Sequence, residues 1–256
     1  MNILLINHYA GSLKHGMEFR PYYLAREWVR AGHNVRIIAA SYSHLRAYQP
    51  SRPSRLRVTW RETLQGINYQ WFWTPVYKRN GILRICNIAA FIVSVFFASR
   101  KILNEFKPDV VIASSTYPMD IWLAQRFSKL ANAKLVFEVH DLWPLSPIEI
   151  GGMSPSHPFI RLCQAAEDAA YRGADLVVSM LPKIAEHATQ KGLPIERLVI
   201  VPNGVSLDEW KDDEPVPIRR DVKDAIDAAH AVGNLVVAYT GSHGLPNALD
   251  TLLDAA

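Results

Sequence analysis

The chain has 256 residues, of which 49% are hydrophobic and 20% are charged, and it contains only two cysteines. This composition is that of an ordinary globular protein, long enough to bury one large core or two modest ones. Cys86 and Cys163 lack metal-type spacing and the N-terminus lacks the basic leader of a signal peptide, which argues against a zinc module or a secreted protein. We therefore expect a cytoplasmic protein with two core thiols.

The net charge of +4 is distributed unevenly along the chain. Residues 1–101 carry 15 lysines and arginines and three acids, a balance of +12, whereas residues 102–256 have a balance of −8. This asymmetry predicts that the first half faces an anionic partner, such as a membrane surface or a phosphorylated acceptor. A solvated basic face without a partner is the alternative. Because no nucleic-acid-binding motif accompanies the charge, we do not expect nucleic acid as a partner.

Short apolar strands alternate with amphipathic helices along most of the chain. The patterns predict strands over residues 2–7, 35–40, 109–113, 134–139, 175–179 and 198–201. They predict helices over residues 18–31, 82–104, 120–131, 158–171 and 182–190, and a hairpin formed by residues 56–62 and 68–74. Strands that alternate with helices imply an α/β fold with a doubly wound parallel sheet.

The composition changes after residue 205. Residues 206–220 are rich in acids and prolines, which indicates a linker, and a helix is predicted over residues 221–231. The apolar run 235–240 predicts a new buried strand, and Leu245 is expected to begin a helix. We therefore expect a first domain over residues 1–205, a linker and helix over 206–234, and the beginning of a second α/β domain over 235–256.

Residues 88–98 form an unbroken apolar stretch inside the predicted helix 82–104. The stretch is shorter than the ~20 residues that span a bilayer, and Arg84, Arg100 and Lys101 flank it. Because the apolar residues surround the helix instead of forming one stripe, the pattern favours a core helix. Membrane contact is then expected at one end of the helix or through its basic neighbours.

Several motifs occur together and in order. They are Asn7-His8-Tyr9, the segment from Gly16 to Tyr23, the segment from Lys107 to Ile112, Glu138-Val139-His140-Asp141-Leu142-Trp143-Pro144, the segment from Glu167 to Ser179, Val201-Pro202-Asn203-Gly204-Val205, and the segment from Ala238 to Gly244. In this combination the chain resembles the bacterial glycosyltransferases of family four, which have a GT-B fold of two facing Rossmann-like domains. The likeness covers nearly the whole chain. Within this family, the chain most resembles enzymes that build O-antigen or capsule from UDP-linked N-acetylated amino sugars, including the N-acetyl-fucosamine transferase type.

The resemblance implies a retaining glycosyltransferase that moves a sugar from a UDP-sugar to a lipid-linked glycan acceptor in cell-surface polysaccharide synthesis. It implies no essential metal and no cofactor other than the UDP-sugar co-substrate, and a peripheral position on the cytoplasmic face of the inner membrane. The family keeps the basic pair and the two glutamates that hold the donor in its second domain, and the present chain ends at Ala256. We therefore expect these 256 residues by themselves to bind donor poorly and to be inactive.

The end of the predicted strand 134–139 is the strongest candidate site. Glu138, His140 and Asp141 lie where that strand ends, and ligands of open α/β sheets bind outside the carboxyl ends of the strands. The resemblance implies that His140 is the catalytic residue, beside the transferred sugar, where its imidazole donates to a hydroxyl or to developing charge. Asp141 is expected to orient His140 or bind acceptor, and Trp143 to shape a pocket wall. The structural alternative is that these residues cap the next segment, with Glu138 a satisfied strand-end carboxylate.

Two glycine-containing loops supply the remaining candidates. Gly11 and Gly16 permit unusual backbone angles ahead of a helix N-terminus, which is a ready anion site. Together with Glu18 and Arg20 they are candidate substrate-binding residues, although Glu18 and Arg20 could instead pair with each other. The resemblance implies that a second loop binds the donor diphosphate through backbone amides and the helix that follows it. That loop consists of Gly241, Ser242, His243 and Gly244.

Two other classes of protein remain open at this stage. One is a non-catalytic half-enzyme that binds an acceptor or a membrane and needs a partner subunit. The other is a GT-B nucleotide-sugar epimerase, which would release UDP or epimerise the sugar without an acceptor.

Overall fold

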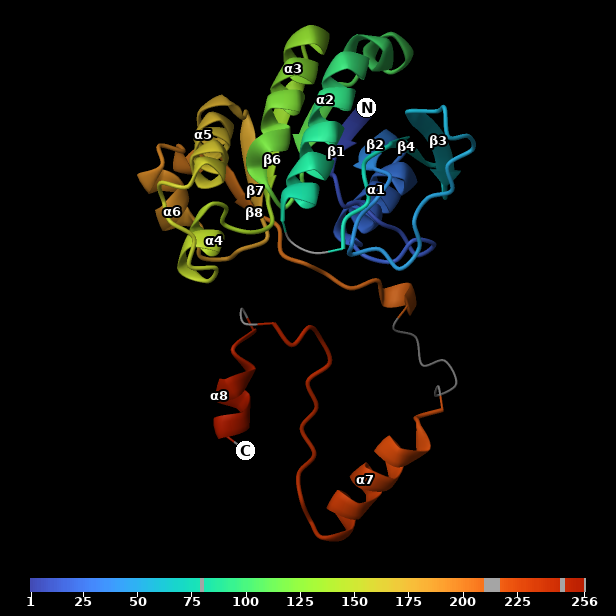
Figure 1. Ribbon diagram of the computed structural model, residues 1–256, viewed down its shortest axis with the longest axis vertical. Helices are drawn as coiled ribbons and strands as arrows, with labels where there is room; N and C mark the ends of the chain where they lie inside the picture. The colour runs from blue at the N-terminus through green and yellow to red at the C-terminus, as the bar shows by residue number, and fades with distance from the viewer. Residues whose placement is uncertain (79–80, 210–216, 245–246, 256) are drawn as a thin grey trace. The chain divides into compact units, whose positions relative to one another are not determined.

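A computed structural model describes residues 1–78, 81–209, 217–244 and 247–255 (Figure 1). The chain divides into two compact units, residues 1–203 and residues 204–256. The first unit holds the whole sheet and is described first.

The first unit is built on one eight-stranded sheet. Its strands are β1 (Asn2–Ile6), β2 (Asn34–Ala40), β3 (Thr59–Leu64), β4 (Ile67–Phe72), β5 (Val110–Ala113), β6 (Lys134–Val139), β7 (Leu176–Ser179) and β8 (Leu198–Ile200). They lie in the order β3-β4-β2-β1-β5-β6-β7-β8, and every neighbouring pair is parallel except β3 with β4. The chain moves from β1 to β2 in one direction and later to β5 in the other. The direction of winding therefore reverses between β1 and β5, which is where sheets of this type bind ligands.

Helices cover both faces of this sheet. The unit contains α1 (Arg20–Arg30), α2 (Ile82–Glu105), α3 (Ile121–Ala131), α4 (Leu145–Glu149), α5 (Pro158–Gly173) and α6 (Ala185–Gln190), and the 3-10 turns η1 (Pro118–Asp120) and η2 (Ile195–Arg197). Alternate residues of β1 enter different cores: Leu4 and Ile6 pack with α2, α3 and α5, whereas Ile3 and Leu5 pack with α1. This alternation follows from the two-residue period of a strand, and it confirms the predicted doubly wound α/β fold.

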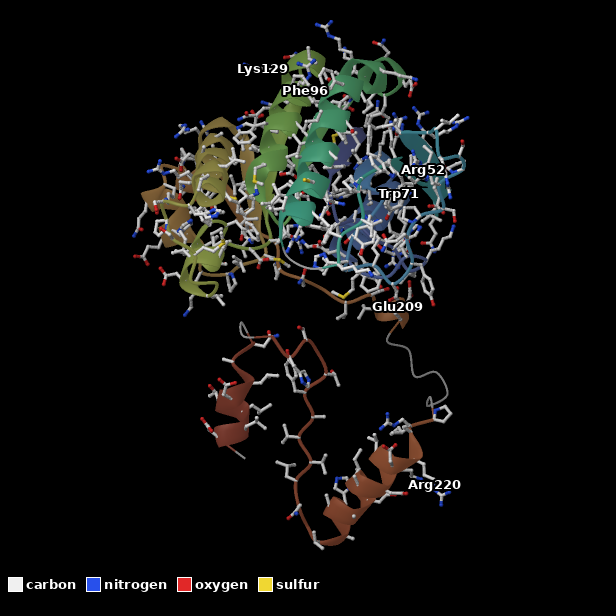
Figure 2. The ribbon with its side chains drawn as sticks, in the orientation of Figure 1. Arg52, Trp71, Phe96, Lys129, Glu209 and Arg220 are labelled. Atoms are coloured by element: carbon white, nitrogen blue, oxygen red, sulfur yellow. The ribbon has the colours of Figure 1, made fainter. Side chains whose placement is uncertain are left out.

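The predicted hairpin is confirmed, and its turn has a simple cause. Strands β3 and β4 pair antiparallel, and only two residues, Gln65 and Gly66, connect them. Both have positive φ, 49° and 80°, as the tight turns of two-residue hairpins require. The fully buried Trp71 of β4, which Figure 2 labels, lies in the core formed with α1. Its ring stacks on that of Tyr69 with 5.1 Å between the centroids.

Helix α2 differs from the expected core helix. By length and composition it is apolar enough to cross a membrane. Only 28% of its most apolar stretch is buried inside the protein. One face, which includes Phe91, Val95 and Ile102, enters the core with α3. The opposite face is exposed to solvent, so the prediction of a core helix was wrong for that face. Of the two predicted core thiols, Cys163 is buried and confirmed, whereas Cys86 is exposed. The sequence pattern failed because α2 is apolar on both the covered face and the uncovered face.

Most predicted boundaries shift by only a few residues. The first helix begins at Arg20 instead of residue 18, and α6 begins at Ala185 instead of Pro182. The short helix α4 was not predicted, because it is only five residues long and no hydrophobic period can develop.

The second unit contains η3 (Leu207–Glu209), α7 (Arg220–Ala231) and α8 (Leu249–Asp254). The predicted helix 221–231 is confirmed, but the predicted strand 235–240 is not formed. Its side chains are largely exposed, with Leu235 at 89% and Val237 at 69%, because no other strand in the described part of this unit offers it a hydrogen-bonding edge. Residues 210–216 of the predicted linker and Leu245 at the predicted helix start lie outside the described residues.

The buried and exposed faces of α2 predict different losses of stability when a phenylalanine is replaced by alanine. Phe91 is fully buried and Phe97 is 80% exposed on the same helix. We expect Phe91→Ala to lower the free energy of unfolding by about 3–5 kcal/mol because it leaves a cavity. Phe97→Ala should change it by less than about 0.5 kcal/mol. Urea unfolding of both variants measures this, and equal losses would contradict the described packing of α2.

Candidate functional site

The candidate site lies at the carboxyl ends of β1, β5 and β6. Asn7 follows β1 and donates from Nδ2 to the Ser114 carbonyl oxygen at 2.5 Å, just after β5. The backbone N–H of His8 donates to Ser115 Oγ at 3.0 Å. These bonds hold the two loops at the point where the winding of the sheet reverses. Glu138 at the end of β6 and His140 just after it lie beside them.

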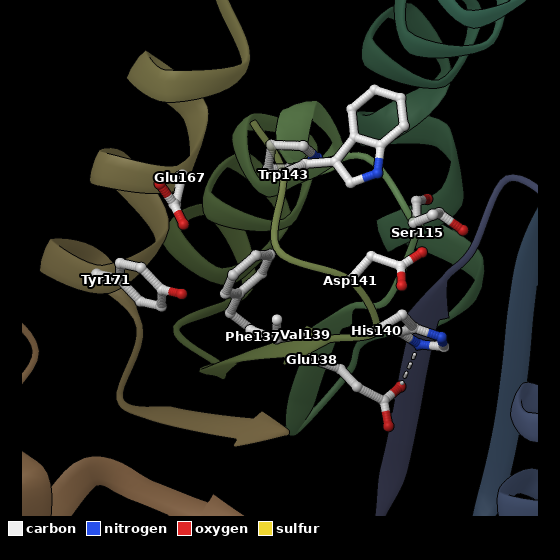
Figure 3. A pocket seen from close by; sticks show the side chains of 11 residues that line it. Ser115, Phe137, Glu138, Val139, His140, Asp141, Trp143, Glu167 and Tyr171 are labelled. Carbon is white, nitrogen blue, oxygen red and sulfur yellow. Dashed lines mark hydrogen bonds and ion pairs between the residues drawn. The ribbon is translucent and has the colours of Figure 1, made fainter. Parts of the chain in front are cut away.

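His140 is held by three hydrogen-bonding partners. Its Nδ1 lies 2.8 Å from Glu18 Oε1, and its Nε2 lies 3.3 Å from Glu138 Oε2 (Figure 3). Ser114 Oγ accepts from Nε2 at 3.1 Å and donates to Glu138 Oε2 at 2.6 Å. The imidazole is therefore fixed between two carboxylates, one from the loop before α1 and one from the end of β6.

Arg20 completes this arrangement from the first turn of α1. Its guanidinium donates from Nε to Glu138 Oε1 at 3.0 Å, and both side chains are more than nine-tenths buried. The same guanidinium donates to the carbonyl oxygens of Val201 and Pro202 and to Asn203 Oδ1, at 2.8, 3.2 and 3.0 Å. Arg20 thus joins the site to the last residues of the first unit. Glu18 and Arg20 do not pair with each other, as one reading of the sequence allowed.

We call Glu18, Arg20, Glu138 and His140 the charge quartet. Burial opposes the charge on His140, but its hydrogen bonds to Glu138 and Glu18 raise its pKa to about 10. Burial is the largest single influence on Glu138 and opposes its charge, but the hydrogen bonds from His140 and Ser114 and the charges of His140 and Arg20 together lower its pKa to about 2. At neutral pH His140 is therefore an imidazolium and Glu138 a carboxylate, and each stabilises the other in a buried place.

The loop before α1 owes its shape to its glycines. A side chain at Gly11 would collide with the backbone carbonyl oxygens of Gly16 and Met17, and Gly16 has a φ of 83°. The Gly11 N–H donates to the Glu18 carbonyl oxygen at 2.8 Å, so the loop folds back on itself. Both glycines therefore help to place Glu18 next to His140, and their predicted contact with substrate stays a prediction.

A small pocket opens beside His140. Ser115, Asp141, Trp143 and Glu167 are among the residues that line it, and Figure 3 shows them around it. Asp141 is exposed, whereas the Trp143 ring packs edge-on against Phe159 at 5.9 Å between centroids. Trp143 therefore forms part of a wall, as predicted. Asp141 lines the pocket, but no hydrogen bond joins its side chain to His140.

A buried polar layer supports the loops after β1 and β5. Burial lowers the pKa of His8 to about 3, and its Nδ1 pairs with the Tyr117 hydroxyl at 2.7 Å. Asp120 Oδ2 accepts the backbone N–H groups of Ser114 and Ser115 at 3.2 and 2.9 Å, and burial raises its pKa to about 6. These contacts fix Ser114 in position to bridge His140 and Glu138.

The sequence did not identify Ser114 as a site residue, and for Glu138 it left open a site role and a satisfied strand-end carboxylate. A signal existed for the serine, because Ser114 and Ser115 follow a predicted strand directly.

The loop Gly241 to Gly244 belongs to the second unit, where Tyr239 Oη and Asn247 Nδ2 donate to the Ser242 carbonyl oxygen at 3.2 and 2.6 Å. The proposed diphosphate contact of this loop stays a prediction. Within the described residues, no group of three or more His, Cys, Asp or Glu side chains is arranged to hold a metal ion.

The charge quartet can recognise polar ligands. Glu18 Oε2 is buried and accepts no hydrogen bond from any residue that the structure describes. A ligand hydroxyl could donate to this carboxylate oxygen, and it could accept from His140 by displacing one of the acceptors that now occupy the two ring N–H groups. Such a pair, placed at the carboxyl edge of a doubly wound sheet, suits a sugar or another polyhydroxylated ligand.

Solved structures share this fold at low sequence identity. Anabaena Alr3699/HepE in complex with UDP and glucose is 15% identical with a TM-score of 0.56, and the match covers 100% of this chain and 57% of HepE. The catalytic domain of starch synthase IV from Arabidopsis thaliana, bound to ADP and acarbose, is also 15% identical with a TM-score of 0.56, covering 93% of this chain and 60% of that one. A comparison with curated proteins finds no match.

These structures and the sheet topology define the fold class as the Rossmann-like α/β fold of GT-B glycosyltransferases. The Glycosyl transferase 4-like domain family matches residues 15–204, which include the charge quartet and nearly the whole sheet. The chain belongs to this family. It spans a little over half the length of HepE, with a coverage of 57%.

The Arg20–Glu138 pair predicts a large cost for removing one partner. Arg20→Gln leaves a buried carboxylate without its guanidinium and should lower the free energy of unfolding by about 3–5 kcal/mol. Adding Glu138→Gln should recover at least about 1 kcal/mol of this loss. The control is Arg30→Gln, whose ion pair with Glu27 is exposed and should contribute less than about 0.5 kcal/mol. Equal effects of Arg20→Gln and Arg30→Gln in urea unfolding would show that the pair is unimportant.

The raised pKa of His140 predicts a specific dependence of stability on pH. A group whose folded pKa of about 10 exceeds its ordinary value of 6.5 stabilises the fold fully below pH 6.5 and loses this effect as pH approaches 10. The difference in unfolding free energy between the wild type and His140→Gln should therefore shrink by up to about 1.4 kcal/mol per pH unit in that window. Urea unfolding at pH 6, 8 and 9.5 measures it, with His33→Gln as control. A difference that is constant with pH would refute the assignment.

Proposed function

We propose that this protein transfers an N-acetylated amino sugar from a UDP-sugar to a hydroxyl of a lipid-linked glycan, with retention of anomeric configuration. The observation that carries the proposal is a buried imidazolium, His140, held at the sheet edge of a family member by two carboxylates. The UDP part is supported by HepE, which was solved with UDP and with UDP-glucose. The amino sugar, the lipid-linked acceptor and the retention follow from the motif resemblance.

In this proposal His140 is the catalytic residue. Its imidazolium donates to a hydroxyl of the transferred sugar or to charge that develops at the reacting centre. Glu138 and Arg20 are positioning residues, because they hold the charge and orientation of His140. The Oε2 atom of Glu18 accepts a ligand hydroxyl. The loop Gly241 to Gly244 contacts the donor diphosphate through its amides, and the reaction needs no bound metal ion.

The cellular setting is proposed on the same grounds. The lipid-linked acceptor places the enzyme at the cytoplasmic face of the inner membrane, where it acts as a peripheral protein in O-antigen or capsule synthesis. The balance of +12 over residues 1–101 supports contact with an anionic surface.

Transfer from labelled UDP-sugars to lipid-linked acceptors tests the proposal. The assay is run on the product of the complete reading frame, and we expect transfer of the sugar with release of UDP. His140→Gln should lower kcat by about 10²–10³-fold, since one charged donor is lost at the reacting centre.

The matched control is His33→Gln, at the amino end of β2, which should retain full activity. Full activity of His140→Gln would refute the role of His140. UDP release with an epimerised sugar and no acceptor product would identify an epimerase instead. Acceptor binding without any transfer by the complete reading frame would indicate a non-catalytic binding subunit.

A further inference from the structure

Helix α2 presents an uncovered apolar stripe along its length. The exposed residues recur at helical spacing, and we call them the α2 stripe: Ile82, Leu83, Ile85, Val93, Phe96 and Phe97. The most exposed are Phe97 at 80% and Ile82 at 78%. Figure 1 shows α2 as an outer layer beside α3, on one face of the sheet. A contiguous apolar surface of this kind on a globular protein marks an interaction site.

A basic groove runs beside the C-terminal half of α2. It has a volume of about 520 Å³, and its charged lining consists of Arg57, Arg61, Lys101 and Glu105. Glu105 is paired with Arg61 and lies 3.9 Å from Nη1 of Arg36, so this one carboxylate faces both arginines. The groove therefore keeps a net positive charge.

Arg36 supports the groove from within the sheet. Its side chain is only 9% exposed and its guanidinium lies over the Phe106 ring, 4.6 Å from the centroid. Burial lowers its pKa to about 10, so it stays charged at neutral pH. Its Nε and Nη1 have no hydrogen-bond acceptor among the described residues. A buried cation with unused donors beside an open groove favours an anionic occupant.

The groove and the α2 stripe are continuous. Lys101 lines the groove and follows Phe97 of the stripe by one helical turn. Helix α2 carries no acid before Glu105, whereas Arg84, Arg100 and Lys101 are basic. Apolar side chains flanked by cations are complementary to a lipid surface that has acyl chains beneath anionic headgroups.

We propose that the α2 stripe and the adjoining basic groove dock this protein on an anionic phospholipid bilayer, with the stripe against the acyl region and headgroup phosphates in the groove. The proposal deepens the proposed function, since a lipid-linked acceptor lies in such a bilayer. Helix α2 lies on the surface and does not span, because Phe91, Val95 and Ile102 on its other face belong to the core. A second copy of this chain is a poorer occupant, because it would bring further basic residues against Arg84, Arg100 and Lys101.

Docking through α2 would also bring the site close to the lipid. Arg84, in the first turn of α2, donates from Nη2 to the Tyr9 hydroxyl at 3.1 Å. Tyr9 belongs to the loop after β1, at the same sheet edge as His140. The start of the α2 stripe thus lies beside the loops of the candidate site, where an acceptor that extends from the bilayer would arrive.

Vesicle co-sedimentation of the 256-residue chain tests the proposal without any transfer reaction. The probes are vesicles of phosphatidylcholine alone and of phosphatidylcholine with 30% phosphatidylglycerol, at several salt concentrations. We expect binding to the anionic vesicles only, weakening as salt rises. Val93→Ser with Phe97→Ser, and separately Arg57→Gln with Lys101→Gln, should each lower the partition coefficient at least about tenfold.

Matched controls lie near the opposite edge of the sheet. Ile195→Ser and the pair Lys183→Gln with Lys191→Gln change exposed residues of the same kinds and should bind like the wild type. Circular dichroism and thermal unfolding confirm that each variant is folded. Because no donor or acceptor is present, failure of docking would leave the proposed transferase activity untouched.

Three results would overturn the proposal. The first is no binding to anionic vesicles, or equal binding by the wild type and both pairs of α2 and groove variants. The second is stabilisation by inorganic phosphate without vesicle binding, which would make the groove a site for a soluble phosphate. The third is a dimer in light scattering that Val93→Ser with Phe97→Ser dissociates, which would make the stripe an interface between copies.

Discussion

The buried ion pair between Arg20 and Glu138 is the interaction on which the candidate site depends. Each charge would be costly alone in the interior, and each is compensated by the other and by hydrogen bonds. Glu138 also holds His140, and Arg20 also holds the carbonyl oxygens of Val201 and Pro202. The first turn of α1, the end of β6 and the last residues of the first unit are therefore fixed relative to one another by one pair of charges.

The same buried charges explain why His140 is protonated. A histidine at a sheet edge is ordinarily neutral near physiological pH, but two carboxylates and Ser114 surround this one. The balance of two acids and two cations in the charge quartet lets the imidazolium persist in a buried place. A ligand that approaches His140 would thus meet a positive charge whose position is already set, which is the condition for electrostatic catalysis.

The first unit could be predicted well from the sequence because its signals are local. The run 134–139 was predicted to the residue, and the alternation of strands and helices gave the correct fold class. The strand 235–240 was wrong because β structure depends on a partner edge, which a local pattern does not contain. Helix α2 was misjudged for a related reason: hydrophobicity shows that a face avoids water and does not show which element, if any, covers it.

The site was predictable in part for the same reason. The position of His140 after a buried strand pointed to the sheet edge, and Glu18, Arg20 and Trp143 were also selected from the sequence. Which of these residues pair with one another was not predictable, because the contacts His140–Glu18 and Arg20–Glu138 join residues more than a hundred positions apart. The roles of Gly11 and Gly16 became clear only from the backbone atoms that a side chain would meet.

The charge state of His140 is the most direct test of this account. Long-range ¹H–¹⁵N spectra of the histidine-labelled protein, with His140→Gln to assign the signal, report which ring nitrogens carry protons. The account predicts that both nitrogens are protonated at pH 8 and that the ring titrates near pH 10. A ring that titrates near its ordinary value, with one protonated nitrogen at pH 8, would show that the charge quartet does not hold an imidazolium and would contradict the central claim.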